Sequence, residues 1–464
     1  MRLLEFILLS ISTALPLLLS FTAVDHHKKR WLIGLSLIFT LHLTLEGYRW
    51  QLIPCYILIL LVLLMIYRNW RFTRKGKMSI IYGCFLTIFL ITPAWILPNI
   101  FPIFTLPVPT GAYQIGSQYL LISTSFDEII IENTNDQREF MIKVWYPAMI
   151  SNEAKEMYLD RGNRAGFSNK YGLPESLMNY MDHIKTNTYV SPKIENKRFP
   201  VLIFSHGLYS EAYGCYGLIE EIVSQGFIVM NINHTYESSG SLFPNGEVLL
   251  FNSEFDRKNN DLKMAEMAWN ASQNYDKAAN EEEQFLAVED LIRTYVGAEI
   301  TNRWSRDVSA LIDYLEVLNT DSFLSKHLDL SKIGAFGHSQ GGSAIGQVML
   351  EDDRISSGIN LDGVQWGNMI DNTLNKPFLL ISSDWPSEHM DLNKFAYRNL
   401  SKDCFQKIII KDSGHSNFMD IPLLVNFPFI NEAGTLNPKK GYRKVSGIII
   451  NFFNNTLNSK KDGM

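Results

Sequence analysis

The sequence predicts an α/β fold with a doubly wound, mostly parallel sheet, preceded by a helical transmembrane segment of about four spans. Three observations lead to this prediction. The first hundred residues are largely apolar with basic breaks, whereas the later part alternates short apolar runs with longer stretches of helical period. A serine flanked by glycines stands between one such run and the stretch that follows it. We therefore expect a transmembrane region at residues 1–103 and a soluble domain at residues 104–464.

Four apolar stretches make up the amino-terminal region, at residues 3–24, 31–45, 50–67 and 78–97. A helix needs about 20 residues to cross a hydrocarbon core of about 30 Å, so the second stretch is the shortest candidate. A cleavable signal peptide is the alternative for the first stretch. Such a peptide carries its cations before the apolar run, however, and here most of them follow it. We expect all four stretches to span the membrane.

Basic residues predict which way these spans face, because short loops rich in Lys and Arg stay in the cytoplasm. The link between the second and third stretches offers only Arg49 beside Glu46. The two other links are strongly basic and contain Lys28, Lys29, Arg30, Arg68, Arg71, Arg74, Lys75 and Lys77. With four spans both basic links fall on one side. We therefore expect a multi-pass protein of the cell membrane whose soluble domain lies on the extracytoplasmic side.

Charge and motifs narrow the classes of partner. The chain has 42 Lys and Arg against 48 Asp and Glu, and the whole acidic excess follows residue 77, because the residues up to that point are net basic. Nucleic-acid binding needs clustered cations, so we expect no nucleic-acid partner. There is no Walker A loop, no H-E-x-x-H motif and no cysteine pair at metal-ligand spacing, so we expect neither a cofactor nor a metal.

The soluble domain opens with strands predicted at 119–123, 128–131 and 141–146, an antiparallel start. From residue 199 the pattern becomes parallel. Further apolar runs predict strands at 201–204, 227–232, 332–336, 358–361, 378–381 and 407–410. The intervening and closing stretches predict helices at 215–224, 304–318, 341–350 and 442–453. Eight or more strands with helical crossovers favour one doubly wound sheet.

One polar interval, at about residues 253–300, is rich in Asn, Glu and Lys and has a helical period. It stands where a cap or lid would be inserted between strands. The alternative is an ordinary helical excursion whose apolar residues cover the sheet. We expect a helical, cap-like insertion.

The strongest local signal is the pentapeptide Gly337-His338-Ser339-Gln340-Gly341, which matches G-x-S-x-G. An apolar run precedes it and a helical stretch follows it, so the serine occupies a strand-to-helix turn. The flanking glycines let the helix approach the neighbouring strand without a Cβ clash. This pattern is typical of the nucleophile turn of α/β-hydrolases, so we expect that fold and expect Ser339 to be a nucleophile.

A serine hydroxyl needs a base and an acid that orients the base, in the chain order Ser, Asp or Glu, His. Two histidines follow Ser339. His415 comes directly after the predicted strand 407–410, whereas His389 lies in a surface-like turn, so we expect His415 to be the base. Asp362 and Asp384 each follow a predicted strand, and spacing alone does not choose between them.

The negative charge that develops on a carbonyl oxygen needs backbone N–H donors. The residue after the nucleophile, Gln340, is one expected donor. The other should come from a loop after an earlier strand, and Leu208 in Ser205-His206-Gly207-Leu208 fits that place. Because the base position is taken, we expect His206 to pack or brace this loop.

Several ordered blocks between residues 107 and 455 resemble the platelet-activating factor acetylhydrolase family, its plasma and intracellular type II enzymes, and bacterial esterase relatives. The blocks are Val108-Pro109-Thr110-Gly111-Ala112-Tyr113, Val144-Trp145-Tyr146-Pro147, Phe204-Ser205-His206-Gly207-Leu208, Gly337-His338-Ser339-Gln340-Gly341-Gly342 and His415-Ser416-Asn417-Phe418-Met419-Asp420. The resemblance implies that Asp362, in a G-x-x-L-D setting, is the acid. It also implies metal-independent hydrolysis of short or oxidised acyl chains at the second position of phospholipids. Gln340 departs from the family, which carries an aromatic residue there.

Together these expectations describe a membrane-anchored serine esterase that works through an acyl-enzyme, with ester or phospholipid substrates and the lipid bilayer as its partners. A carboxylesterase or lipase acting on other esters is the alternative within enzymes. A non-catalytic membrane receptor or scaffold with a hydrolase fold is the alternative from another class.

Overall fold

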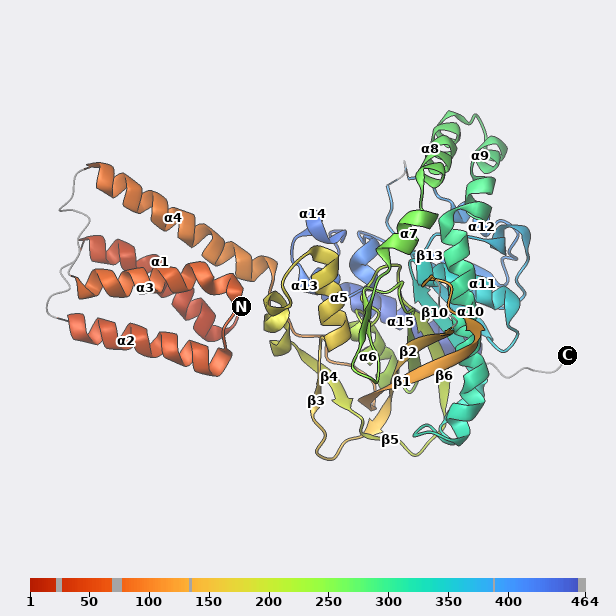
Figure 1. The fold of residues 1–464 in the computed structure, drawn as a ribbon, viewed down its shortest axis with the longest axis horizontal. Helices are drawn as coiled ribbons and strands as arrows, with labels where there is room; N and C mark the ends of the chain where they lie inside the picture. Colours follow the sequence, from red (N-terminus) through yellow and green to blue (C-terminus); the bar gives the residue numbers. More distant parts are fainter. Residues whose placement is uncertain (22–26, 69–76, 133–135, 387–388, 458–464) are drawn as a thin grey trace. The chain divides into compact units, whose positions relative to one another are not determined.

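The computed structural model of the chain describes residues 1–464 except 22–26, 69–76, 133–135, 387–388 and 458–464 (Figure 1). The chain divides into two compact units. The helical unit contains Met1–Thr105, Ser176–Ile184 and Leu423–Asn431, and the sheet unit contains the remainder. The helical unit thus takes in two later segments that lie beyond the predicted boundary at residue 103.

The helical unit is built on four helices, α1 (Leu3–Phe21), α2 (Lys28–Leu41), α3 (Ile53–Tyr67) and α4 (Lys77–Ile100), with η1 (His42–Glu46) and η2 (Trp50–Leu52) between α2 and α3. Each helix overlaps one predicted span. Among the described residues, Trp50–Tyr67 is long and apolar enough to cross a membrane, and Leu3–Leu15 and Ile88–Ile100 are shorter apolar helices. The prediction of four spans is therefore not confirmed. Part of the first span and part of the basic link before the fourth lie outside the described residues.

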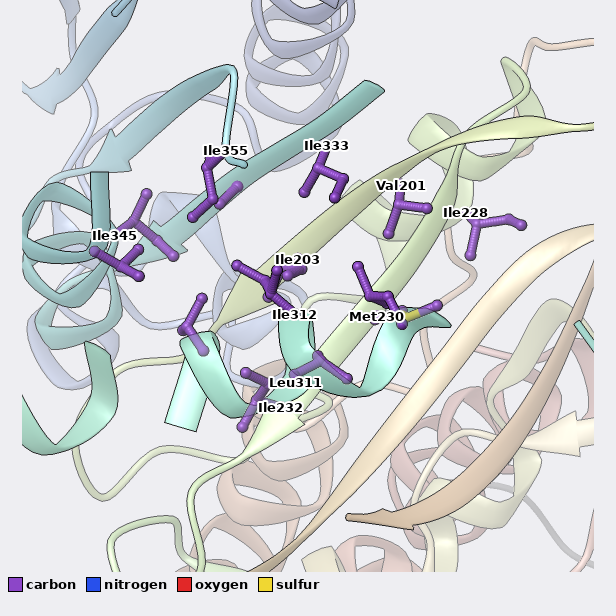
Figure 2. Packing of buried hydrophobic residues seen from close by; sticks show 14 of the residues in the cluster. Val201, Ile203, Ile228, Met230, Ile232, Leu311, Ile312, Ile333, Ile345 and Ile355 are labelled. Atoms are coloured by element: carbon purple, nitrogen blue, oxygen red, sulfur yellow. The ribbon is translucent and has the colours of Figure 1, made fainter. Parts of the chain in front are cut away.

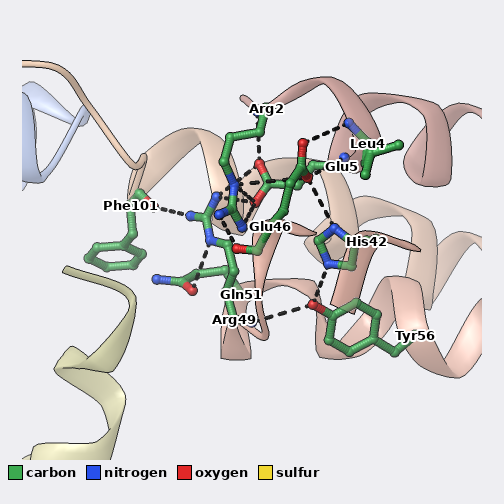
Figure 3. Close-up of polar contacts among 9 residues, drawn as sticks. All are labelled: Arg2, Leu4, Glu5, His42, Glu46, Arg49, Gln51, Tyr56 and Phe101. Atoms are coloured by element: carbon green, nitrogen blue, oxygen red, sulfur yellow. Dashed lines mark hydrogen bonds and ion pairs between the residues drawn. The ribbon is translucent and has the colours of Figure 1, made fainter. Parts of the chain in front are cut away.

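A buried ion network fixes one end of these helices, as Figure 3 shows. The Arg49 guanidinium contacts both carboxylate oxygens of Glu5, at 3.0 and 3.2 Å, and donates to the carbonyl of Phe101 at 2.6 Å. The Glu46 carboxylate accepts from the backbone N–H groups of Leu4 and Glu5, so it satisfies the free donors at the start of α1. Since the side chains of Glu5 and Arg49 are fully buried, each needs the other as a partner.

The sheet unit contains an 11-stranded sheet among the described residues, in the order β13-β12-β11-β10-β6-β7-β2-β1-β4-β3, with β5 beside β2. The strands are β1 (Gln114–Asp127), β2 (Gln137–Met149), β3 (Lys155–Met157), β4 (Lys185–Val190), β5 (Lys193–Ile194), β6 (Phe199–Ser205), β7 (Ile228–Asn233), β10 (Leu328–His338), β11 (Ser357–Leu361), β12 (Phe378–Ser383) and β13 (Phe405–Ile410). The run from β13 to β7 is parallel, and β7, β2 and β1 pair antiparallel. The predicted α/β fold with a mostly parallel sheet is therefore confirmed.

The strand predicted at 128–131 is wrong. Residues 128 and 129 leave the sheet and 130 and 131 form a bend. The cause is Glu128, whose side chain accepts from the N–H of Ile130 at 2.8 Å and pairs with Arg138 at 2.9 Å. An acidic side chain that turns back onto its own backbone competes with the strand ladder.

Two pairs of helices cover the sheet. Helix α6 (Tyr216–Ser224) joins β6 to β7, and α11 (Gln340–Glu351) joins β10 to β11. These connections leave the middle of the sheet in opposite directions, so right-handed crossovers put the two helices on opposite faces. Helix α10 (Val296–Thr320) packs on α11, and α15 (Pro438–Leu457) packs on α6.

The main core lies between the sheet and α10, as Figure 2 shows. Alternate residues of the strands point to this face, among them Val201 and Ile203 of β6 and Met230 of β7. Leu311 and Ile312 of α10 pack against them. The spacing of two along strands and of three to four along the helix thus produces one shared apolar layer.

The polar interval 253–300 is helical. It forms α7 (Ser253–Asn259), α8 (Leu262–Lys277), α9 (Glu281–Thr294) and the first turn of α10. The side chains of Asn252, Asp261 and Asn280 cap the first three helices at their N-termini. Helices α8 and α9 form a hairpin (Figure 1), and their inner face packs on α12 (Asn393–Ala396) through Phe395 and Val288.

Candidate active site

Ser339 stands at the turn between β10 and α11 in a backbone conformation that serine rarely adopts, with φ 55° and ψ −123°. The flanking glycines make this turn possible. A Cβ on Gly341 would lie 2.2 Å from the carbonyl oxygen of Ser205, and one on Gly337 would lie 2.3 Å from that of Gly341. Neither space admits a carbon atom, so both glycines of the pentapeptide are needed where the sequence has them.

The structure brings His415 and Asp362 together. Asp362 follows β11, His415 begins the short helix η6 (His415–Phe418) after β13, and the Nδ1 atom of His415 lies 2.8 Å from Oδ2 of Asp362. The carboxylate also accepts from the N–H and hydroxyl of Ser383, both at 2.7 Å, and from the indole N–H of Trp385 at 3.0 Å. All of these partners belong to β12 and the residues just after it.

Burial by itself would raise the pKa of Asp362, but the hydrogen bond and attraction from His415, followed by the donors of Ser383, outweigh it and hold the pKa below its usual value. The acid is therefore ionised at neutral pH. It accepts the Nδ1 proton of His415, which leaves Nε2 of that ring as the proton acceptor.

Asp384, the other candidate acid, has a different partner. Its carboxylate accepts from the backbone N–H of Asp412 at 2.9 Å. It lines the same pocket as His415, but in the described part of the chain no hydrogen bond or ion pair joins the two side chains. His389 lies close by, with its ring stacked on Trp385 at 4.4 Å between centroids.

Ser339 and His415 border one pocket, yet no hydrogen bond joins their side chains in the part of the chain that the structure describes. Bonds between nucleophile and base are often long in structures without substrate and tighten when substrate is bound.

The two expected oxyanion donors are available. Among the described residues, no protein group accepts from the N–H of Leu208 or of Gln340. Gln340 is the first residue of α11, where N–H groups are free of helical bonds and the helix dipole favours a negative charge. The loop bearing Leu208 is near, since a Cβ on Gly207 would lie 3.2 Å from Cβ of Ser339. The Gln340 side chain instead donates to the carbonyl of Gly297 in α10, at 2.9 Å.

Three residues that contact His415 or Asp362 were not predicted from the sequence. The ring of His338 lies beside that of His415, tilted by 34° with 4.6 Å between centroids, and its Nε2 donates to the carbonyl oxygen of His415 at 3.1 Å. Burial and the nearby His415 ring lower the pKa of His338 to about 3, so this ring stays neutral. Ser383 and Trp385, which hold Asp362, were likewise not singled out. The position of His338 inside G-x-S-x-G was its only signal.

The pocket above these residues has a volume of about 470 Å³. Ser339, Asp362 and His415 line it together with an apolar set, Val364, Trp366, Met390 and Leu392. A charged set, Asp384, Asp391, Lys407 and Glu432, also lines it. Such a pocket suits a molecule with an apolar part and a polar, charged part. Among the described residues no cluster of three or more His, Cys, Asp or Glu side chains could hold a metal ion.

The model of the family "Platelet-activating factor acetylhydrolase, isoform II" matches residues 100–463. The platelet-activating factor acetylhydrolase of Cavia porcellus is 26% identical over 338 residues, which are 68% of this chain and 69% of that protein. A probable 1-alkyl-2-acetylglycerophosphocholine esterase of Arthroderma benhamiae is 22% identical over 290 residues, 58% of this chain and 64% of that protein. The chain thus spans about two thirds of the length of these relatives.

A solved structure shares the fold. The ferulic acid esterase from Streptomyces cinnamoneus superposes with a TM-score of 0.59 over 77% of this chain and 94% of the esterase, at 20% sequence identity. At that identity the likeness concerns the fold alone.

Proposed function

Because the chain belongs to the platelet-activating factor acetylhydrolase, isoform II, family of ester hydrolases, we propose that it cleaves carboxylic esters through an acyl-enzyme on Ser339. The observation that carries the proposal is the pocket itself. It collects a serine on a strained strand-to-helix turn, a histidine held by a buried carboxylate, and an N–H group at a helix N-terminus. These are the parts that acyl transfer requires.

The reaction runs in two halves. Ser339 Oγ forms a bond to the ester carbonyl carbon while its proton passes to Nε2 of His415, and the carbonyl oxygen becomes an oxyanion. The N–H groups of Leu208 and Gln340 bind that oxyanion. When the intermediate collapses, the bond to the alcohol oxygen breaks and the alcohol takes the proton from His415. Water then repeats the sequence on the acyl-enzyme and releases the acid and Ser339.

The substrates proposed are short-chain acyl esters of phospholipids. The names of the relatives support this class, since they describe acetylhydrolases and an esterase of 2-acetylglycerophosphocholines. The apolar and charged sets that line the pocket suit the two ends of such a molecule.

The placement proposed for the enzyme is in the cell membrane, with four spans and the sheet unit on the extracytoplasmic side. Helices over all four apolar stretches support this placement, as do their many exposed apolar side chains, for example Leu3 (72% exposed), Leu45 (73%) and Phe85 (69%). The two basic links support the orientation.

The test compares the full-length wild type in detergent with Ser339→Ala. Both are assayed with a metal chelator on p-nitrophenyl acetate and on a 2-acetyl phospholipid. Turnover of both esters by the wild type alone is the expected result. Turnover of p-nitrophenyl acetate only would favour a general carboxylesterase. A folded wild type that turns over neither ester would contradict the proposal and favour a binding role for the fold.

A further inference from the structure

A second series of Ser, His and Asp side chains lies beneath the loop that bears Leu208. Ser205 Oγ lies 2.8 Å from Nε2 of His234, and Nδ1 of His234 lies 2.7 Å from Oδ2 of Asp307. The geometry is that of a catalytic triad. All three residues are completely buried, however, so no substrate reaches Ser205. The series must therefore serve the surrounding structure.

The protonation states of Asp307 and His234 follow from their burial and their buried partners. Burial would raise the pKa of Asp307, but the charge of Arg138, the hydrogen bond from His234 and two hydrogen bonds from Arg138, at 3.0 and 2.7 Å, hold the pKa well below the usual range. Burial lowers the pKa of His234 in spite of Asp307. The His234 ring is thus neutral. It donates from Nδ1 to Asp307 and accepts the Ser205 hydroxyl at Nε2.

His206 joins this series to the loop. The backbone N–H of His234 donates to Nε2 of His206 at 3.2 Å, so the proton of the neutral His206 ring is on Nδ1. That Nδ1 donates to the carbonyl oxygen of Gly207 at 2.7 Å. Burial, with the neighbouring His234, lowers the pKa of His206 to about 3, so this arrangement persists at neutral pH. Trp304 supports both rings, stacked on His234 at 3.9 Å between centroids.

The Gly207 carbonyl and the Leu208 N–H belong to the same peptide group. A trans peptide is planar, so these two bonds point in opposite directions and fixing one fixes the other. The carbonyl accepts from His206 and also from the N–H of Ser210, at 3.2 Å. On the far side of Leu208, the N–H of Tyr209 donates to the carbonyl of Glu237 at 2.9 Å. Hydrogen bonds to the carbonyl also polarise the N–H at the other edge of the peptide.

We propose that His206 is a positioning residue for oxyanion binding. By donating from Nδ1 to the Gly207 carbonyl it directs the Leu208 N–H, and the buried Ser205–His234–Asp307 series holds His206 in the required place and tautomer. The inference rests on the proposed function, in which the Leu208 N–H binds the oxyanion.

The test uses two full-length variants, each of which keeps one of the two hydrogen bonds that the His206 ring makes. His206→Asn places an amide N–H near the former Nδ1 and keeps the donor to Gly207. His206→Gln places its amide near the former Nε2 and keeps only the acceptor for His234. The kcat and KM of each are measured on p-nitrophenyl acetate and on its thiono ester, in which sulfur replaces the carbonyl oxygen. Sulfur accepts hydrogen bonds weakly, so the ratio of the two rates reports on oxyanion binding. His327→Asn is the matched control, because His327 Nδ1 also donates to a carbonyl, that of Lys197, at the other end of β10.

We expect His206→Gln to lose about 100-fold in kcat on the oxygen ester with little change in KM, and its preference for the oxygen ester over the thiono ester to shrink. His206→Asn should recover most of both, and His327→Asn should match the wild type. Equal losses in Asn and Gln, or an unchanged ester ratio in Gln, would overturn the proposal. If Gln does not fold, ¹⁵N spectra of histidine-labelled wild type decide, since a His206 ring protonated at Nε2 would overturn it. An inactive wild type would instead contradict the proposed function.

Discussion

The Nε2 atom of His338 donates to the carbonyl oxygen of His415 at 3.1 Å, so the residue before the candidate nucleophile holds the loop of its candidate base. Replacing His338 by Phe removes this hydrogen bond, at a cost of about 1 kcal/mol. We expect kcat to fall about tenfold or more in His338→Phe. His338→Gln, whose amide can reach the same oxygen, should lose less. Equal kcat values in the two variants would show that the bond is irrelevant.

Asp362 and Asp384 offer a direct contrast. In Asp362→Asn the carboxylate that accepts the Nδ1 proton of His415 is lost. The new amide N–H can instead donate to Nδ1, which stabilises the His415 tautomer that is protonated at Nε2 and cannot act as a base. We expect kcat to fall by about 10⁴-fold, as expected when the acid of a triad becomes an amide. Asp384→Asn, whose carboxylate binds the N–H of Asp412, should lower kcat less than tenfold. Steady-state kinetics on p-nitrophenyl acetate measure both, and a larger loss in Asp384→Asn would reverse the assignment.

Gly341→Ala should damage the fold as well as the site. The new Cβ would lie 2.2 Å from the carbonyl of Ser205 and 2.4 Å from that of His206, so backbone must move. We expect a loss of about 3 kcal/mol or more in the free energy of unfolding, and no labelling by a fluorophosphonate probe. Gly447→Ala is the control, because its Cβ meets nothing within 4 Å and alanine favours the interior of α15. That variant should melt at the wild-type temperature or slightly above.

Glu220 predicts how stability depends on pH. Burial raises the pKa of this carboxyl to about 7, although hydrogen bonds from Asn187 and Thr188 oppose the effect. The folded state therefore holds the proton more tightly than the unfolded state. Its contribution is fully present below about pH 4.5 and is lost as pH rises through about 7, on the order of 3 kcal/mol.

Glu220→Gln removes the group whose deprotonation lowers the stability. The melting temperature of this variant should therefore fall less than that of the wild type between pH 5 and pH 8. Asp420, whose pKa burial raises to about 6, acts in the same direction, and so part of the fall should remain. Glu316→Gln, on the exposed side of α10, is the control and should follow the wild type. Parallel curves for Glu220→Gln and wild type would contradict the assignment.

The proposed orientation can be tested with single cysteines. Lys29 lies in the first basic link, and Tyr48 lies in the link with few cations, 57% exposed. With the native cysteines replaced, we expect a membrane-impermeant maleimide to label Tyr48→Cys in intact cells. Lys29→Cys should react only after the membrane is opened. Labelling of Lys29→Cys in intact cells would contradict four spans with an external sheet unit.

The sequence predicted the parallel part of the sheet well, because buried parallel strands such as β6 and β12 are continuous apolar runs. It failed where an element depends on a distant partner. Residues 128–131 are apolar enough for a strand, but Glu128 turns toward Arg138 and ends it. The short polar strands β3 and β5 have no pattern of their own and form because β4 and the end of β2 offer them a partner for pairing.

The site shows the same division. The local sequence predicted Ser339 as the candidate nucleophile, because the glycines of the G-x-S-x-G pattern around it can be recognised in the sequence. The choice of Asp362 over Asp384 needed the resemblance, because both follow strands that end at the same edge of the sheet. The contacts of Asp362 with Ser383 and Trp385, and of His206 with His234, join segments far apart in the chain. No spacing rule in one sequence reveals such contacts.

The buried series under the Leu208 loop also orders events during folding. Arg138 comes from β2, His234 follows β7, and Asp307 belongs to α10, so the series closes only when segments up to 169 residues apart have met. Contacts at such sequence distance form late because their loops are costly to close. We expect a chain that has assembled only part of its sheet to lack a formed oxyanion site. A nascent or misfolded copy would then hydrolyse esters poorly, and esterase activity would be confined to the fully folded protein.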